Sequence, residues 1–179
     1  MFMKTRIFPP LALALAMAAF SVSSALSAPA PASGPAPKLL GKFKDWSAYS
    51  MDQNNHTVCF ATSEPKSTTL SDKSASRGDP FFLVTNWPGK PLQPSLIMGY
   101  PQSADKHVKI KIGNDNFEMF VQNDGAWMET EDGDKKLTDA MRKGAIMMVD
   151  GESAKGTKST DRYSLAGISS ALEKVSACK

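Results

Sequence analysis

The chain has 179 residues and a formal net charge of +3 at pH 7, and 41% of its residues are hydrophobic. This length suits one globular domain behind an N-terminal leader. The small net charge excludes the strongly basic surface that marks nucleic-acid-binding domains. No apolar segment reaches the roughly 20 residues of a membrane-spanning helix, so we expect no integral membrane span in the mature protein.

Residues 1–27 have the features of a cleaved secretory signal peptide. Lys4 and Arg6 precede an apolar run over residues 7–20, and small residues follow over 21–28. Cleavage before Ala28 would remove both basic residues and leave a mature protein of nearly neutral charge. We therefore expect a periplasmic, cell-surface or secreted protein, in a compartment where thiols tend to be oxidised.

Residues 28–42 are predicted to form a Pro/Ala-rich linker in front of a domain over residues 43–179. The tract at 29–37 reads PAPASGPAP, and alternating proline favours extended polyproline II over core packing. The tract would be a spacer, or equally an N-terminal tail without a role of its own.

Short apolar segments separated by turn residues predict a mainly β domain, an antiparallel β-sandwich with two short helices. Helical spacing of apolar residues predicts one helix over residues 137–143 and a second from Ile168 to Val175. The polar residues 64–79 are expected to form a long loop. We expect strands at residues 43–49, 56–62, 80–85, 95–100, 108–112, 117–121, 126–130, 145–149 and 157–165.

A hairpin is the clearest local feature of the sequence. Residues 108–112 alternate apolar side chains with lysines, residues 117–121 continue the alternation, and Gly-Asn-Asp-Asn stands between them. A four-residue turn would place Ile112 opposite Phe117, with all the apolar partners on one face. Phe120 would then stand on the polar face, where it covers a second packing surface or contacts a partner.

The chain holds two cysteines, Cys59 and Cys178, and both remain after removal of the leader. An even number of cysteines in an exported protein predicts one intramolecular disulfide. Free thiols and intermolecular pairing are the alternatives. A bond that closes so long a loop would stabilise the fold by on the order of 4–5 kcal/mol in the chain-entropy treatment.

No motif for catalysis, a cofactor or a metal is present in the sequence. The chain has two histidines, His56 and His107, and it has no G-x-S-x-G nucleophile turn. The acidic residues between 124 and 139 lack the spacing of a calcium-binding loop. The methionines fall mostly on expected core positions and are better explained by packing than by copper binding. We therefore expect no enzyme activity, no cofactor and no metal.

Trp87, Lys90 and Phe120 are the residues that we expect to contact a partner. Trp87 and Lys90 share the turn WPGKP at residues 87–91, and an indole at a strand end is often half-buried, with its polar edge accessible. An ordinary core edge would explain the same aromatic residues. The loop at 64–79 is the second candidate contact region.

Six short segments and the C-terminal cysteine form a distinctive set: residues 43–46 (FKDW), 58–60 (VCF), 99–101 (GYP), 124–127 (DGAW), 140–144 (AMRKG) and 160–167 (TDRYSLAG), together with Cys178. This set resembles the invasion-associated locus B family of alphaproteobacteria. The resemblance implies an exported, disulfide-containing β-sandwich of immunoglobulin-like type, although the Cys…Trp…Cys spacing of antibody domains is absent. It implies a non-enzymatic envelope protein that binds a host-cell surface or a periplasmic protein, with a housekeeping role in envelope assembly or stress response as the alternative.

Overall fold

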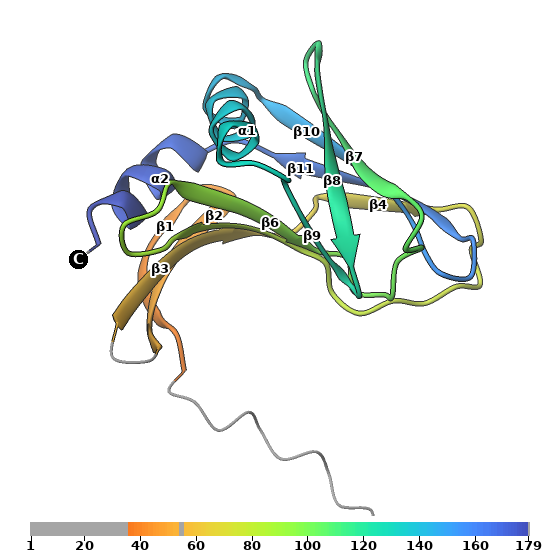
Figure 1. Cartoon of the computed structure of the whole chain (residues 1–179), viewed down its shortest axis with the longest axis horizontal. Helices are drawn as coiled ribbons and strands as arrows, with labels where there is room; N and C mark the ends of the chain where they lie inside the picture. The colour runs from red at the N-terminus through yellow and green to blue at the C-terminus, as the bar shows by residue number, and fades with distance from the viewer. Residues whose placement is uncertain (1–35, 54–55, 179) are drawn as a thin grey trace, which may run out of the picture. The chain divides into compact units, whose positions relative to one another are not determined.

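The computed structural model describes residues 36–53 and 56–178 (Figure 1). Within these residues eleven strands pair into one antiparallel sheet, and two helices, α1 (Glu131–Lys143) and α2 (Ile168–Ser176), accompany it. The predicted mainly β, antiparallel fold class with two helices is confirmed. In order of pairing the strands are β1 (Lys38–Phe43), β2 (Trp46–Gln53), β3 (His56–Ser63), β5 (Phe81–Asn86), β6 (Leu92–Ile97), β9 (Gly125–Trp127), β8 (Asp115–Gln122), β7 (His107–Ile112), β10 (Ile146–Glu152), β11 (Lys158–Ser164) and β4 (Ser67–Leu70).

The sheet curls so that strands far apart in the pairing order meet again. β3 pairs with β2 and β5, whereas β4, which follows β3 after three residues, pairs with β11. The Trp46 indole in β2 donates to the backbone carbonyl of Ser164 in β11 at 2.9 Å, and the Lys66 amide donates to Arg162 at 2.7 Å. The two layers of the predicted sandwich are therefore two halves of one curled sheet.

The hydrophobic core lies on the inner face of this curled sheet, the face that carries the buried residues. Phe82 in β5 is at its centre, because its ring packs against Trp46 at 6.3 Å and against Tyr163 at 6.0 Å. All three side chains are fully buried. Helix α2 packs on β1, β2, β3 and β5, and α1 packs on β6. Both helices therefore contribute their apolar faces to the same core.

Helix α1 begins six residues earlier than predicted. Thr130 caps it, since its hydroxyl accepts a hydrogen bond from the Gly133 amide at 3.1 Å. Three acidic residues lie in the first turn and two basic residues in the last, as the helix dipole favours. Asp132, Gly133 and Asp134 lie inside the helix, because this cap and these charges offset the low helix propensity of glycine.

Helix α2 matches the helix predicted from Ile168 onward, and it carries the disulfide. The helix starts after Gly167, whose φ of 94° suits glycine, and it buries an apolar stripe against the sheet. Cys59 in β3 and Cys178 just beyond α2 are joined, with a Cα–Cα distance of 6.2 Å. The predicted intramolecular disulfide is confirmed, and it ties the end of α2 to the sheet.

The hairpin is formed by β7 and β8, in a register that differs from the predicted one. Ile110 pairs with Phe117 and Ile112 with Asp115, so the predicted pairing of Ile112 with Phe117 was wrong by two residues. Gly113, at φ 59°, permits a tighter turn than the expected four residues. A shift of two residues keeps every side chain on its predicted face, so Phe120 remains on the face opposite the core.

Two strands form where the sequence predicts none. Strand β1 lies within the predicted linker at 28–42, so the ordered domain begins before Phe43. Strand β4 lies within the predicted loop at 64–79. Strand β1 pairs with β2 and packs Leu40 and Phe43 against the core. The polar β4 is held by backbone pairing with β11. The predicted signal peptide at 1–27 lies outside the described residues.

Neither helix in the described part of the chain is long and apolar enough to cross a membrane.

Candidate functional site

The outer face of the sheet, which points away from the core, carries a continuous row of side chains. In an antiparallel sheet, residues that pair directly across strands lie on the same face. The pairings therefore define a row that crosses seven strands from β1 to β8. Its members are Lys42, Ser47, Thr62, Leu83, Ser95, Trp127 and Phe120.

A second, more apolar row lies beside the first. Leu39, Tyr49 and Phe60 pair in succession across β1, β2 and β3, and the Tyr49 and Phe60 rings stack at 5.5 Å. Leu39 is 47% exposed. Among the large hydrophobic residues that the structure describes, it is the most exposed. Phe81 and Ile97 pair on the other side of the first row. Apolar side chains thus extend across five neighbouring strands of the outer face.

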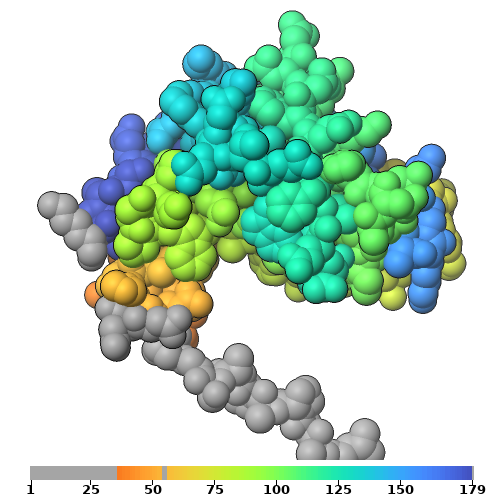
Figure 2. All heavy atoms as spheres, in the orientation of Figure 1, coloured from red at the N-terminus to blue at the C-terminus, as the bar shows by residue number. Residues whose placement is uncertain are grey.

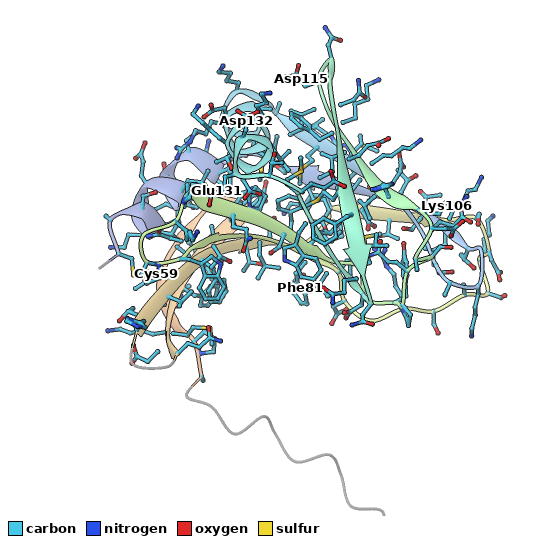
Figure 3. The ribbon with its side chains drawn as sticks, in the orientation of Figure 1. Cys59, Phe81, Lys106, Asp115, Glu131 and Asp132 are labelled. Atoms are coloured by element: carbon cyan, nitrogen blue, oxygen red, sulfur yellow. A yellow bond between two sulfur atoms is a disulfide. The ribbon has the colours of Figure 1, made fainter. Side chains whose placement is uncertain are left out.

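This part of the outer face is hollowed into a groove of ≈ 630 Å³, called the outer groove below. Its apolar lining is formed by Tyr49, Phe60, Phe81, Leu83 and Ile97, and hydroxyl groups stand among these side chains. Figure 2 shows the hollow between the atoms of β2 and β3 and those of β8 and β9. In Figure 3 the Phe81 side chain lies on the side of the sheet opposite the helices. The volume of the outer groove is within the range of about 300–1,000 Å³ that is typical of ligand sites.

Charged residues at one end of the outer groove make it more basic than acidic. Three lysines, Lys42, Lys44 and Lys66, and two acids, Asp45 and Glu64, line this end. Lys66 forms an ion pair with Asp45 at 2.5 Å, and this hydrogen bond lowers the pKa of the Asp45 carboxyl below its ordinary value. Within residues 36–53 and 56–178, Lys42 and Lys44 form no ion pair. Their charges are therefore available to a ligand.

Two of the three predicted contact residues lie on the outer face. The Phe120 ring packs beside Trp127 at 6.0 Å. The Trp87 indole donates to the Gln93 side chain at 2.9 Å, and Gln93 continues the row of Tyr49 and Phe60 through Thr85. Both predicted aromatic residues are half-buried. Neither of them lines the outer groove.

Lys90, the third predicted contact residue, lies elsewhere. It occupies the turn between β5 and β6, and its ammonium group is 3.4 Å from Glu131 at the start of α1. Both side chains are more than 60% exposed. The sequence places Lys90 close to Trp87, but the structure directs it toward the helix rather than toward the outer groove.

The predicted contact loop at 64–79 divides between two roles. Residues 64–66 line the outer groove, whereas Arg77 turns inward and pairs with the fully buried Asp161 at 2.5 Å. Thr68 in β4 donates to the same carboxylate at 2.6 Å, and the Arg77 guanidinium lies over the Tyr100 ring. Burial raises the pKa of the Tyr100 hydroxyl. Arg77 and Thr68 therefore anchor the loop to the buried Asp161, while most of its other residues stay exposed.

The described residues offer no assembled catalytic or metal site. His56 and His107 are exposed at the starts of β3 and β7, and neither side chain hydrogen-bonds to a serine or a carboxylate in this part of the structure. No three His, Cys, Asp or Glu side chains gather there to hold a metal ion. The chemistry that the outer face does offer is apolar contact, aromatic stacking and lysine charge.

Sequence reasoning missed most of the outer groove. Strand 80–85 reads as apolar on both faces, which is typical of a strand buried on both sides. A usable signal was present at Phe60, Leu83 and Trp127, which are apolar residues at positions where an alternating strand would carry polar ones. The sequence alone did not show that these positions share one face.

The family described as "Invasion associated locus B (IalB) protein" matches residues 46–176 of this chain. In structure, the chain is similar to the invasion associated protein B from Bartonella henselae, with a TM-score of 0.57 and 17% sequence identity. The similarity covers 76% of this chain and 94% of the Bartonella henselae chain. At this identity it shows a common fold. No curated protein matches the chain.

Proposed function

Because this chain belongs to the invasion-associated locus B family, we propose that it is a non-enzymatic exported envelope protein that binds a protein partner through its outer groove. The observation that carries the proposal is the apolar outer face, which neither helix covers. Soluble proteins rarely leave contiguous apolar surface open unless it is an interaction site. Tyrosine and tryptophan are also enriched at the centres of protein interfaces.

Export is supported by the predicted leader at 1–27 and by the disulfide between Cys59 and Cys178. Disulfides persist in oxidising compartments outside the cytosol. The family name, and the name of the similar Bartonella henselae protein, connect such proteins with invasion. We therefore propose a protein of the host-cell surface as the partner.

A charge introduced into the centre of the outer groove tests this function. Leu83→Glu should weaken binding of the purified mature protein to host-cell membranes at least tenfold, because a buried carboxylate would oppose apolar contact. Lys111→Glu introduces the same residue on the outer face of β7, away from the outer groove, and should leave binding within twofold. Equal binding by both variants and the wild-type protein would show that the outer groove is not the contact site.

The location of the protein tests the host-directed part of the proposal. Protease added to intact cells should cut the domain while a periplasmic control protein is spared. Protection of the domain until the outer membrane is opened would exclude direct host contact. The partner would then be sought inside the periplasm, in envelope assembly or stress response.

A further inference from the structure

Resting on the proposed function, we infer that the outer groove takes an extended segment of its partner with acidic residues at one end and apolar residues along the rest. The acidic end would lie at the turn between β1 and β2, beside Lys42 and Lys44. The apolar residues would lie over Phe60, Leu83 and Phe81. Two features of the outer groove carry this inference: the uneven charge along its length and the polar groups in its floor.

The charge argument begins from the lysines. Lys42 and Lys44 lie at the β1 end of the outer groove and form no ion pair among the described residues, whereas Lys66 is already paired with Asp45. Glu64 lines the same end, so the two lysines without an ion pair exceed its single negative charge. The opposite end is formed by Phe81 and Ile97, which carry no charge. A ligand that matches both ends must therefore be acidic at one end and apolar at the other.

The floor of the outer groove distinguishes a peptide from a lipid chain. Ser47 and Thr62 pair with one another in the row that contains Leu83. Both line the groove, so two adjacent hydroxyl groups lie beside its apolar side chains. An extended peptide presents a backbone donor and acceptor at every residue, and these hydroxyls are suitable partners for them. An acyl chain has no polar group to satisfy the hydroxyls, which would be desolvated without compensation.

The shape of the outer groove also suits an extended segment. The lining residues come from β1, β2, β3, β5 and β6, which are successive neighbours in the sheet. Neighbouring strands lie about 4.8 Å apart, so the outer groove spans roughly 20 Å, which corresponds to about six residues of extended chain. A partner loop or tail of that length would cross the strands from the lysine end to the aromatic end.

The test uses a displayed library of random peptides of about 12 residues, a length that exceeds the span of the groove. The library is selected on the disulfide-bonded mature protein, and peptides that also bind the Leu83→Glu variant are removed. The sequences that remain should be enriched in Asp and Glu next to aliphatic or aromatic residues. Synthetic copies with each acid replaced by Lys should bind at least tenfold more weakly at low salt.

Charge-reversal variants complete the test. K42E/K44E should remove the preference for acidic peptides or reverse it, while K109E/K111E, with the same change on β7, should keep it. The inference is overturned if groove-dependent peptides are neutral or basic, if both double variants behave alike, or if palmitate displaces the peptides and binds more tightly than they do. In these cases the proposed function still stands, provided that Leu83→Glu weakens binding to host-cell membranes. If Leu83→Glu weakens neither binding to host-cell membranes nor the binding of any peptide selected on the wild-type protein, both the inference and the proposed function are overturned.

Discussion

Phe81 and Phe82 are neighbours in β5, but they belong to two different regions of the molecule. Phe82 faces inward, is fully buried and packs between Trp46 and Tyr163. Phe81 faces outward, is half-buried and lines the outer groove. Because strand residues alternate between faces, one short apolar segment supplies both regions. The inner face therefore buries its apolar residues completely, whereas the outer face leaves apolar residues partly in contact with solvent.

The largest expected effect comes from truncating each phenylalanine in turn. Phe82→Ala should lower the free energy of unfolding by about 4 kcal/mol, because it leaves a cavity at the centre of the core. Phe81→Ala should lower it by about 1 kcal/mol or less, because the side chain is already partly in contact with water. Urea denaturation of the two variants measures the difference. Equal losses would mean that the outer face is a second core rather than a binding surface.

The two faces also differ in their ion pairs, which gives the second prediction. Arg77 and Asp161 are 7% and 0% exposed, whereas Lys66 and Asp45 at the outer groove are 46% and 30% exposed. Arg77→Met should cost about 3 kcal/mol of stability, because it leaves a buried carboxylate unpaired. Lys66→Met should cost under about 1 kcal/mol.

A double variant separates the loss of the buried pair from the loss of the arginine side chain. R77M/D161N should be more stable than Arg77→Met alone in the same denaturation experiment, since it removes the unpaired charge. If the double variant is the less stable of the two, the buried charge does not account for the loss.

The smallest effect concerns Asp134 in α1. Burial, and then the neighbouring Glu131, raise the pKa of its carboxyl to about 6, and its Oδ1 atom lacks a hydrogen-bond partner among the described residues. A pKa that is higher in the folded state than in the unfolded state, where it is 3.8, means that stability is lost as the pH rises through 6. The change in the free energy of unfolding caused by Asp134→Asn should therefore be more favourable at pH 8 than at pH 3, by about 2 kcal/mol.

The control for that prediction is Asp132→Asn in the same helical turn. Asp132 is 70% exposed and pairs with Lys136 at 2.7 Å, so its substitution should not reproduce the gain with rising pH. Thermal unfolding of both variants and the wild-type protein from pH 3 to 8 provides the measurement. Parallel curves for Asp134→Asn and the wild-type protein would refute the role assigned to Asp134.

Much of the local structure follows from short-range patterns in the chain. Alternation over residues 107–122 determined which faces of β7 and β8 are apolar, and the spacing of Ile168, Leu172 and Val175 determined the buried stripe of α2. The even number of cysteines indicated the pairing of Cys59 with Cys178. These features depend on periodicity and composition, which are local properties of the chain.

The remaining features depend on contacts between segments that are distant in the chain. The polar β4 forms because its backbone pairs with β11, to which it has no sequence proximity. Tyr49, Leu83 and Trp127 share one surface because β2, β5 and β9 are brought into one sheet. Whether an outward apolar residue becomes buried or remains open depends on whether a helix covers it, and here both helices pack on the inner face. The outer groove is thus a consequence of strand order and helix placement, which long-range packing determines and local sequence does not.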